Sequence, residues 1–485
     1  MNSCSMDSAT HITSAASTRL ITSTEVRFSE IISALSVALD ITQGQPAGHC
    51  MRTALIGMRL SDELRLPSAD CSALFYALLL KDLGCSSNAA KMAYLFAADD
   101  QVVKRTGRMI DWTSPSQCVK HCWKNAAPQG SVVDKMLRVV ALFRLGPEGG
   151  RKIAEIRCER GADIARMLKL PEATATAIYD LDEHWNGSGN PRGLKGAEIS
   201  LLGRICCLAQ TVEVFFRSYG LESAMDMAGE RRGKWFDPQL VDALTAIKHD
   251  AAFWNLLLGD NLLTELGHWE PADATLFADE DSLDRVAEAF AKVVDAKSPW
   301  TYQHSARVAE ITVGVAQQFG CTPEVSRDLR RAALLHDIGK LGVSNLILDK
   351  PGKPTEDEFK QIRMHPDYSQ QILERVDAFK SLADVASAHH ERLDGGGYHR
   401  RLGGAEIPWA TRVLTVADIC EAMSARRPYR DAMSWEQIRE IMAKDAGRGV
   451  DRDCLLALEQ WQERNQLDSR VEEQLREVDR LLGEL

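Results

Sequence analysis

The sequence lacks the marks of several protein classes. No apolar run in its 485 residues reaches the length of a membrane span, and its start, MNSCSMDSAT, lacks the charged and apolar regions of a secretion signal. The formal net charge of -11 argues against a general nucleic-acid coat, because proteins that coat DNA or RNA are basic. We therefore expect no membrane span and no DNA or RNA polymer as partner. The negative net charge does not exclude a small anionic substrate, because a few Arg and Lys side chains can make the electrostatic potential of one cleft positive.

Cysteine is also sparse. Twelve cysteines in 485 residues are too few for a disulfide scaffold, and those at 206 and 207 lie in an apolar helical context. We expect reduced thiols in the protein core and a cytoplasmic location. Cys118 and Cys122 flank His121 at helical spacing, but a lone Cys-x3-Cys reflects packing far more often than metal binding. No phosphoacceptor domain or cofactor motif is evident.

Strand signals are scarce, and helical periodicity takes their place. Ile31, Leu35 and Leu39 recur every four residues, and similar patterns cover most of the chain. The hydrophobic content of 45% and the charged content of 26% are typical of a globular protein. The length is sufficient for two to four domains, each with its own core. We predict an all-α fold.

The chain contains an internal duplication. Two ordered pairs of similar segments lie 255 residues apart, and two later pairs lie 208 residues apart. The pairs are 48–52 with 303–307, 78–84 with 333–339, 183–187 with 391–395, and 196–199 with 404–407. The difference between the two offsets means that the first copy is about 47 residues longer, with the extra residues between 88 and 180.

The second copy gathers imidazole and carboxylate side chains that the first copy has mostly lost. Six of the twelve histidines lie between 304 and 399. Seven candidate metal ligands follow in order: His304, His336, Asp337, His365, His389, His390 and Asp418. A single histidine on an apolar face is usually a satisfied core residue, but the His-Asp and His-His pairs together predict a metal centre. Each divalent metal takes roughly four to six N and O ligands, so this set suits two divalent cations.

The local context of these residues supports a phosphate-directed site. Adjacent helical residues point about 100° apart, so His336 and Asp337 reach one centre only if it lies beside their helix. The Asp337 carboxylate can then offer one oxygen to each of two cations. Arg307 shares a helix face with His304 and can reach an anionic substrate. Asp418 lies in an apolar helix, where a carboxylate is costly unless it is paired or metal-bound.

In the first copy, His49 and Asp82 are kept, but four ligand positions and the position of Lys340 carry other residues. The replacements, with the second-copy residue first, are His336 by Lys81, His389 by Leu181, His390 by Asp182, Asp418 by Gln210 and Lys340 by Cys85. An ammonium repels a cation and leucine offers no lone pair, so we do not expect the same metals there. We interpret the first copy as a scaffold, a dimerisation surface or a sensor.

The second copy resembles the HD-GYP family, a branch of the HD-domain metal phosphohydrolases, over roughly residues 285–460. The shared motifs are His336-Asp337-Ile338-Gly339-Lys340, Leu348-Asp349-Lys350-Pro351-Gly352, His365-Pro366, His389-His390-Glu391-Arg392-Leu393-Asp394-Gly395, Gly397-Tyr398, Val416-Ala417-Asp418 and Arg427-Pro428-Tyr429-Arg430. The resemblance implies tandem helical-bundle HD-type domains, the second intact and the first degenerate. It also implies hydrolysis of cyclic di-GMP, or a related cyclic dinucleotide, to the linear dinucleotide or GMP.

The resemblance also implies how the ligands divide between two metals. One set would be His304, His336, Asp337 and Asp418, and the other would be Asp337, His365, His389 and His390. Iron or manganese is favoured by the family, and zinc or nickel fits the ligand types equally well. Two positions depart from the family pattern. His399 follows Gly397-Tyr398 where the family has proline, so the loop is expected to be looser, and Trp300 replaces a glutamate that recruits a third metal in some members.

The candidate catalytic residues are Asp337 and Lys340, and the ammonium of Lys340 would bind a phosphate oxygen. The candidate substrate-binding residues are Arg307, Lys340, Arg426, Arg427 and Arg430, although the last three also suit a solvated helix start. Cyclic di-GMP is the substrate that we expect first. The alternatives are a phosphohydrolase for cyclic GMP-AMP or another nucleotide, and a non-catalytic regulator that binds a dinucleotide.

The predicted organisation has five parts. They are a flexible start over 1–25, a degenerate copy over 26–260, a linker over 261–282, an intact copy over 283–465 and an amphipathic helix over 466–485. The last segment approaches heptad spacing through Val471, Leu475, Val478 and Leu482, which suits docking on its own domain or a two-chain coiled coil. A homodimer through the first copy or through this helix is therefore an expected alternative.

Overall fold

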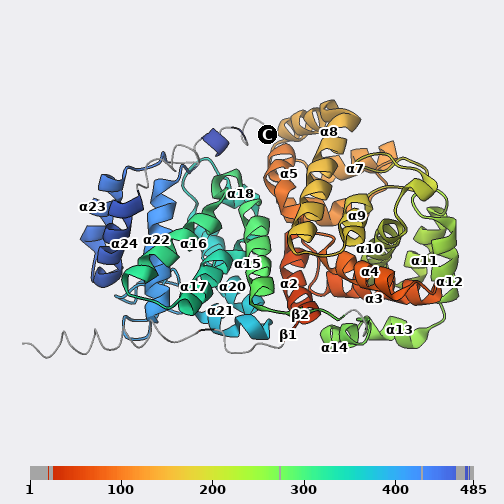
Figure 1. Ribbon diagram of the computed structural model, residues 1–485. Helices are drawn as coiled ribbons and strands as arrows, with labels where there is room; N and C mark the ends of the chain where they lie inside the picture. Colours follow the sequence, from red (N-terminus) through yellow and green to blue (C-terminus); the bar gives the residue numbers. More distant parts are fainter. Residues whose placement is uncertain are drawn as a thin grey trace, which may run out of the picture. The chain divides into compact units, whose positions relative to one another are not determined.

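The computed structural model describes residues 20, 26–271, 275–427, 430–465, 476–478 and 480. Within these ranges the regular secondary structure is helical, apart from strands β1 (Val26–Arg27) and β2 (Phe277–Ala278), which pair antiparallel (Figure 1), and a few isolated bridges. This confirms the all-α prediction. None of the helices in the described ranges combines the length and the hydropathy of a bilayer span. The predicted flexible start falls outside these ranges except at residue 20, and so does the predicted C-terminal helix except at 476–478 and 480.

The chain divides into two compact units. The N-terminal unit comprises residues 25–282, and the C-terminal unit comprises 283–485 with 1–24. The α-helices of the N-terminal unit are α2 (Phe28–Thr42), α3 (His49–Glu63), α4 (Ser68–Leu80), α5 (Ala89–Phe96), α6 (Asp100–Gly107), α7 (Pro115–Asn125), α8 (Val132–Met167), α9 (Glu172–Asp180), α10 (Leu201–Tyr219), α11 (Leu221–Glu230), α12 (Pro238–Ala246), α13 (Ala251–Leu256) and α14 (Leu262–Gly267). Residues 261–282, predicted as a linker, contain α14 and β2 and belong to this unit.

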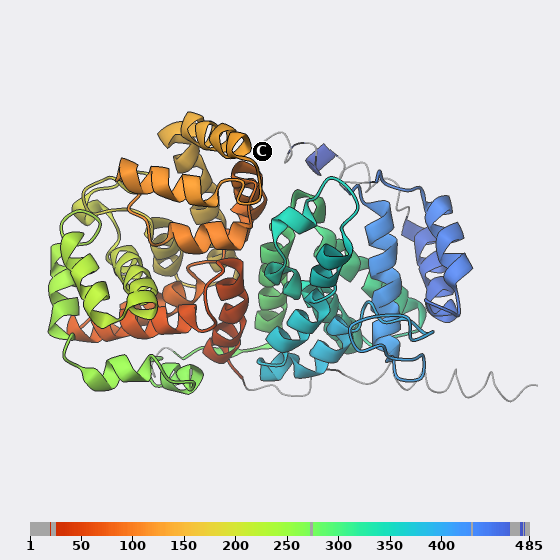
Figure 2. The same cartoon turned by 180° about the vertical axis from the view of Figure 1, so that it is seen from behind.

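The C-terminal unit is likewise built of helices (Figure 2). Its α-helices are α15 (Glu280–Asp295), α16 (His304–Gln318), α17 (Pro323–Leu335), α18 (Asn345–Leu348), α19 (Glu356–Ile362), α20 (His365–Leu373), α21 (Lys380–Ser387), α22 (Trp409–Ser424), α23 (Trp435–Asp445) and α24 (Arg452–Asn465). Helix α16 packs against α17, α22 and α24, and α21 packs against α17, α20 and α22.

Local sequence explains where the helices that carry the site begin and end. Helix α17 starts after Thr322, whose side chain accepts a hydrogen bond from the Val325 amide, with Pro323 in the first turn. Its buried apolar residues, including Leu329 and Leu335, hold it in the core. The helix ends just before His336, so the next two side chains are delivered at a helix terminus in the interior.

The duplication is visible in the element bounds. Helices α3 and α16 both span fifteen residues and begin 255 residues apart, as do α4 and α17. Helices α9 and α21 begin 208 residues apart, as do α10 and α22. Buried Asp40 and Asp295 also match, since each accepts hydrogen bonds from backbone amides at the start of α3 or α16. The extra residues of the first copy lie within 89–147, which contains α5, α6, α7 and the first part of α8; the second copy has only residues 344–355 at this place, with α18.

Candidate metal centre

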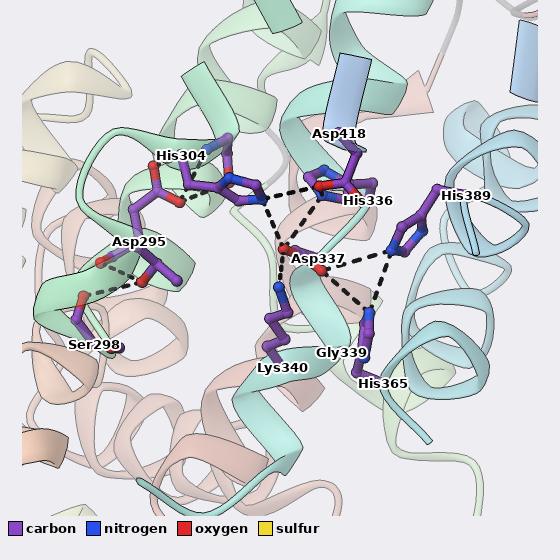
Figure 3. Close-up of polar contacts among 12 residues, drawn as sticks. Asp295, Ser298, His304, His336, Asp337, Gly339, Lys340, His365, His389 and Asp418 are labelled. Atoms are coloured by element: carbon purple, nitrogen blue, oxygen red, sulfur yellow. Dashed lines mark hydrogen bonds and ion pairs between the residues drawn. The ribbon is translucent and has the colours of Figure 1, made fainter. Parts of the chain in front are cut away.

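Five segments of the C-terminal unit bring the predicted ligands together (Figure 3). His304 opens α16, and His336 and Asp337 follow the last residue of α17. His365 opens α20, His389 and His390 follow α21, and Asp418 lies within α22. All seven side chains are buried or nearly so.

Asp337 lies at the centre of the cluster, with one carboxylate oxygen facing each side. Its Oδ2 atom lies 3.2 Å from Nε2 of His304 and 3.2 Å from Nε2 of His336. Its Oδ1 atom lies 3.2 Å from Nε2 of His365 and 3.8 Å from Nε2 of His389. The carboxylate therefore stands between two sets of imidazoles, in the position that a bridging ligand requires.

Three overlapping groups place one ligand atom per residue within 4.8 Å of one another. They are His304 with His336 and Asp418, His336 with Asp337 and His389, and His365 with His389 and His390. Asp418 Oδ1 completes the first group at 3.5 Å from His304 Nε2 and 3.7 Å from His336 Nε2. The groups include all seven candidate ligands, and among the described residues no such group occurs in the N-terminal unit.

The imidazole tautomers suit metal binding. The Nδ1 atoms of His336, His365 and His389 lie 2.6 to 2.7 Å from the backbone carbonyl three residues earlier. A carbonyl only accepts, so each Nδ1 carries a proton and donates it, which leaves Nε2 as the ring atom that can ligate a metal. Backbone contacts of this kind orient ligating histidines in metal sites.

His304 is oriented by a carboxylate instead. Its Nδ1 atom makes a short contact with Oε2 of Glu421, which lies one turn after Asp418 in α22 and is fully buried. Arg427 approaches the same carboxylate at 3.5 Å. Glu421 was not among the sequence candidates. The duplication signals it, however, because Glu213 occupies the matching position 208 residues earlier and makes the same contact with His49.

Buried atoms at the centre suit a cation. Nε2 of His304, Nε2 of His336 and Oδ1 of Asp337 are buried without a hydrogen-bond partner. Leaving such groups unsatisfied in the interior is costly. Imidazole nitrogens and carboxylate oxygens converge here without cysteine, so the donor set is consistent with a metal centre.

The neighbouring carboxylates also raise the pKa values of His304 and His336. Burial disfavours charge on His304, but Glu421 and Asp337 outweigh it and raise its pKa to about 9. Burial acts likewise on His336, while Asp337 and Asp418 raise its pKa to about 10. The pKa of each of these two aspartates lies well below its usual range, despite burial, because of the same contacts. At neutral pH these two imidazoles therefore carry protons that a bound cation would have to displace.

The imidazoles of His389 and His390, on the other side of Asp337, are kept neutral. Burial, reinforced by neighbouring imidazoles, lowers the pKa of His389 well below its usual range and that of His390 to about 3. Neutral imidazoles are the form that ligates metals. The Lys340 ammonium pairs with Oδ2 of Asp337, next to both groups. Lys340 follows Gly339 in the 3-10 turn η5 (Ile338–Gly342), which packs tightly on α20.

The predicted substrate arginines have diverse surroundings. Arg427 donates to the backbone carbonyl of Trp300 at 2.9 Å, besides its approach to Glu421. Arg430 donates to the carbonyls of Ala422 and Met423 at the end of α22, at 2.6 and 2.8 Å. The charge of Arg307 helps to lower the pKa of Glu421, and Arg426 lies 3.9 Å from the exposed side chain of Asp431. Substrate contacts by these four residues stay a prediction.

A further cation at the centre was missed from the sequence. The exposed Arg363 guanidinium lies 5.3 Å from the ring of Tyr398, and that ring lies 4.8 Å from the ring of His390. The only clue to Arg363 in the sequence is its position two residues before His365. His399, next to Tyr398, lies 3.1 Å from Gln370 through its Nε2 atom, and the Tyr398–His399 peptide bond is cis.

In the N-terminal unit, the side chains of Lys81 and Arg108 surround Asp82, which is the counterpart of Asp337. The fully buried Lys81 ammonium lies 3.0 Å from Nε2 of His49 and pairs with Asp82. Arg108, from the extra segment after α6, donates to Asp82 at 3.0 Å and to Gln210 at 2.9 Å. These cations neutralise the remaining carboxylate without a metal.

At the positions that match His365 and His390, the N-terminal unit has an ion pair instead of two imidazoles. Arg157 stands 208 residues before His365, and Asp182 stands 208 residues before His390. The two side chains pair with each other. Gly84 packs on the Arg157 carbonyl as Gly339 packs on the His365 carbonyl, so the backbone arrangement is kept while the ligands are not.

Known proteins share this organisation. A family model described as HD domain matches residues 144–240 and 288–454, which lie in both copies. The 3'3'-cGAMP-specific phosphodiesterase 3 of Vibrio cholerae is 43% identical over 89% of this chain and 93% of its own length. A cyclic di-GMP phosphodiesterase response regulator of Xanthomonas campestris is 34% identical over 37% of this chain and 47% of its own.

Solved structures agree with the sequence comparison. A crystal structure of the cyclic GMP-AMP-specific phosphodiesterase V-cGAP3 of Vibrio cholerae has a TM-score of 0.62 and 39% identity. The likeness covers 90% of this chain and 98% of that one. Together with the paired imidazoles around Asp337, these likenesses establish that the chain belongs to the HD-domain family, as a phosphohydrolase related to the HD-GYP proteins and the cyclic GMP-AMP phosphodiesterases.

Proposed function

We propose that the protein is a metal-dependent phosphodiesterase that hydrolyses 3'3'-cyclic GMP-AMP. The observation that carries the hydrolase proposal is the Asp337 carboxylate, with one oxygen toward His304 and His336 and the other toward His365 and His389. The negative carboxylates, the neutral imidazoles and the buried unsatisfied nitrogens around it suit two divalent cations, with iron or manganese favoured.

The choice of cyclic GMP-AMP departs from the substrate first expected from the sequence, which was cyclic di-GMP. It is supported by the extent of the likeness. A relative named for 3'3'-cGAMP matches 89% of the chain, including both copies, whereas the cyclic di-GMP phosphodiesterase of Xanthomonas campestris matches 37%. The sequence alternative thus becomes the main proposal, and cyclic di-GMP stays as the second candidate.

The residues around the metal centre have different roles in the proposed reaction. When bound, two cations supply a water of lowered pKa and neutralise charge on the phosphate. Lys340 is already held against Asp337, and from there its ammonium can bind a phosphate oxygen. The ring of Tyr398 offers a flat surface beside His390, suited to a nucleobase. The low pKa of His390 keeps this imidazole neutral beside the substrate.

The test uses the purified full chain with 3'3'-cyclic GMP-AMP and cyclic di-GMP, each at the same concentration, with products separated by chromatography. We expect faster hydrolysis of cyclic GMP-AMP. Asp337→Ala should abolish turnover of both and lower the bound metal. Asp377→Ala, at a side chain that is 70% exposed and outside the ligand groups, is the matched control and should behave as the wild type.

Two results would overturn the proposal in different ways. Faster hydrolysis of cyclic di-GMP would refute the substrate assignment and keep the enzyme class. Full activity of the Asp337→Ala variant would refute the metal-dependent mechanism itself. Metal analysis of the same preparations identifies the cation and its number per chain.

A further inference from the structure

Arg363 places an unpaired guanidinium beside the candidate metal centre. The residue is exposed and lies in the turn between α19 and α20. Its guanidinium lies 4.4 Å from the ring centre of Phe359 and 5.3 Å from the ring centre of Tyr398. Within the described ranges, no carboxylate or carbonyl oxygen forms a hydrogen bond or an ion pair with it. The N–H groups of this guanidinium are therefore available to a ligand.

The ring of Tyr398 lies between Arg363 and the imidazoles of the centre. It is 4.8 Å from the ring of His390, so the guanidinium and that imidazole are no further apart than two successive ring contacts. Burial and the carboxylates of the centre raise the pKa of Tyr398, whereas the positive charge of Arg363 lowers it. The same phenol ring is thus within electrostatic reach of the ligand carboxylates and of Arg363.

Two of the arginines predicted from the sequence are engaged by the protein itself. Arg430 donates to backbone carbonyls at the end of α22. Arg427 donates to the Trp300 carbonyl and approaches the Glu421 carboxylate. These contacts use N–H groups that a substrate phosphate would need. Arg363 differs from both, because its neighbours are two aromatic rings that accept none of its N–H groups in conventional hydrogen bonds.

We propose that Arg363 binds the second phosphate of the cyclic dinucleotide, the one that is not held by the metals. The inference rests on the proposed function, because a cyclic dinucleotide brings two phosphodiesters to one site. Two bound cations neutralise the phosphate that is hydrolysed. The other phosphate carries a negative charge of its own and belongs to the same ring of the substrate. It therefore needs a protein cation close to the centre, and Arg363 is a cation whose donors are not engaged.

The two aromatic rings orient this guanidinium without using its hydrogen-bond donors. A guanidinium that lies over an aromatic face keeps the N–H groups at its edge, and its planar fork binds two phosphate oxygens at once. A side chain that is held in advance loses less conformational freedom on binding. The edge of a nucleobase also accepts hydrogen bonds from arginine, but a contact between opposite charges is the stronger of the two. The charge therefore favours the phosphate.

The experiment measures kcat and KM of the full chain for 3'3'-cyclic GMP-AMP and for cyclic di-GMP, at about 50 mM and about 500 mM NaCl. At the lower salt, Arg363→Met should raise KM by about 10-fold, as expected for the loss of one charge-assisted contact. The change in kcat should be smaller, because this contact is present before and during the reaction. Salt screens an exposed ion pair, so the difference in KM between this variant and the wild type should shrink at the higher salt.

Two further variants separate the charge from the shape of the side chain. Arg363→Lys keeps the positive charge, so it should keep the salt dependence of KM while losing part of the affinity. Arg375→Met, at an exposed arginine just beyond the other end of α20, is the matched control and should behave as the wild type. Metal content is measured on every sample and should be the same in all of them, because neither arginine is a metal ligand.

Three results would overturn the assignment of Arg363. One is a wild-type KM in Arg363→Met. Another is loss of metal from that variant, which would make the arginine a structural support of the centre. The third is a rise in KM of the same size at both salt concentrations, which would indicate contact with an uncharged nucleobase. A wild-type protein that hydrolyses neither dinucleotide would instead refute the proposed function itself, on which this inference depends.

Discussion

Replacing Glu421 by glutamine changes one buried contact of the candidate metal centre and leaves every ligand in place. The Glu421 carboxylate holds the Nδ1 proton of His304, so Nε2 is the ring atom that faces Asp337 and Asp418. A glutamine of the same size can instead donate its amide N–H to Nδ1, and the ring proton then resides on Nε2. An imidazole in that tautomer cannot ligate a cation through Nε2.

The expected magnitude is that of a single orienting hydrogen bond to a ligating histidine. Removing such a bond changes metal affinity or activity by about 10- to 100-fold, which is about 1.4–2.7 kcal/mol. The loss of affinity should fall on the group with His304, His336 and Asp418. His365 and His389 are oriented by backbone carbonyls, which the substitution does not alter, so their group should keep its metal.

The assay is equilibrium dialysis of Glu421→Gln against buffered metal, with metal content and kcat measured on the same samples. The duplication supplies a matched control, because Glu213 makes the same contact with His49 and lies 2.6 Å from Nε of Arg52. Glu213→Gln should cost similar stability, about 1–3 kcal/mol, without changing metal content. The reasoning is refuted if Glu421→Gln binds metal with wild-type affinity, or if the Glu213 variant loses as much.

Three further predictions concern the same two sites. The protons that carboxylates hold on His304 and His336 must leave before their Nε2 atoms bind metal, so metal affinity should rise with pH through and above the neutral range, as titration calorimetry can measure; a flat profile would contradict this. Gly339→Ala places a Cβ 1.9 Å from the His365 carbonyl and should lower both kcat and Tm, whereas Gly84→Ala, with the same 1.9 Å approach in the first copy, should lower only Tm. Lys81→Met leaves a buried carboxylate with less compensation and should cost about 3–5 kcal/mol in denaturant unfolding; a loss below about 1 kcal/mol would contradict the pairing.

Motifs and periodicity predicted the fold class and the candidate ligands, because both depend on local sequence. The four-residue recurrence of apolar residues in α2 defines a buried face, and Ile31, Leu35 and Leu39 are indeed fully buried. Helix ends are local as well, which is why His336 and His365 could be expected at the ends of helices. The division of the chain into five parts, including the linker over 261–282, stays a prediction.

The sequence by itself determined which residue types are present and in what order, and that was sufficient to predict an imidazole and carboxylate centre. Only the tertiary structure decided that one oxygen of Asp337 faces each histidine set, and that Glu421, 117 residues from His304, orients its ring. Only the fold shows that Arg108 joins Lys81 at the Asp82 carboxylate in the first copy. The physical reason is that these contacts join segments far apart in the chain, so their geometry arises from packing between helices and not from any local pattern.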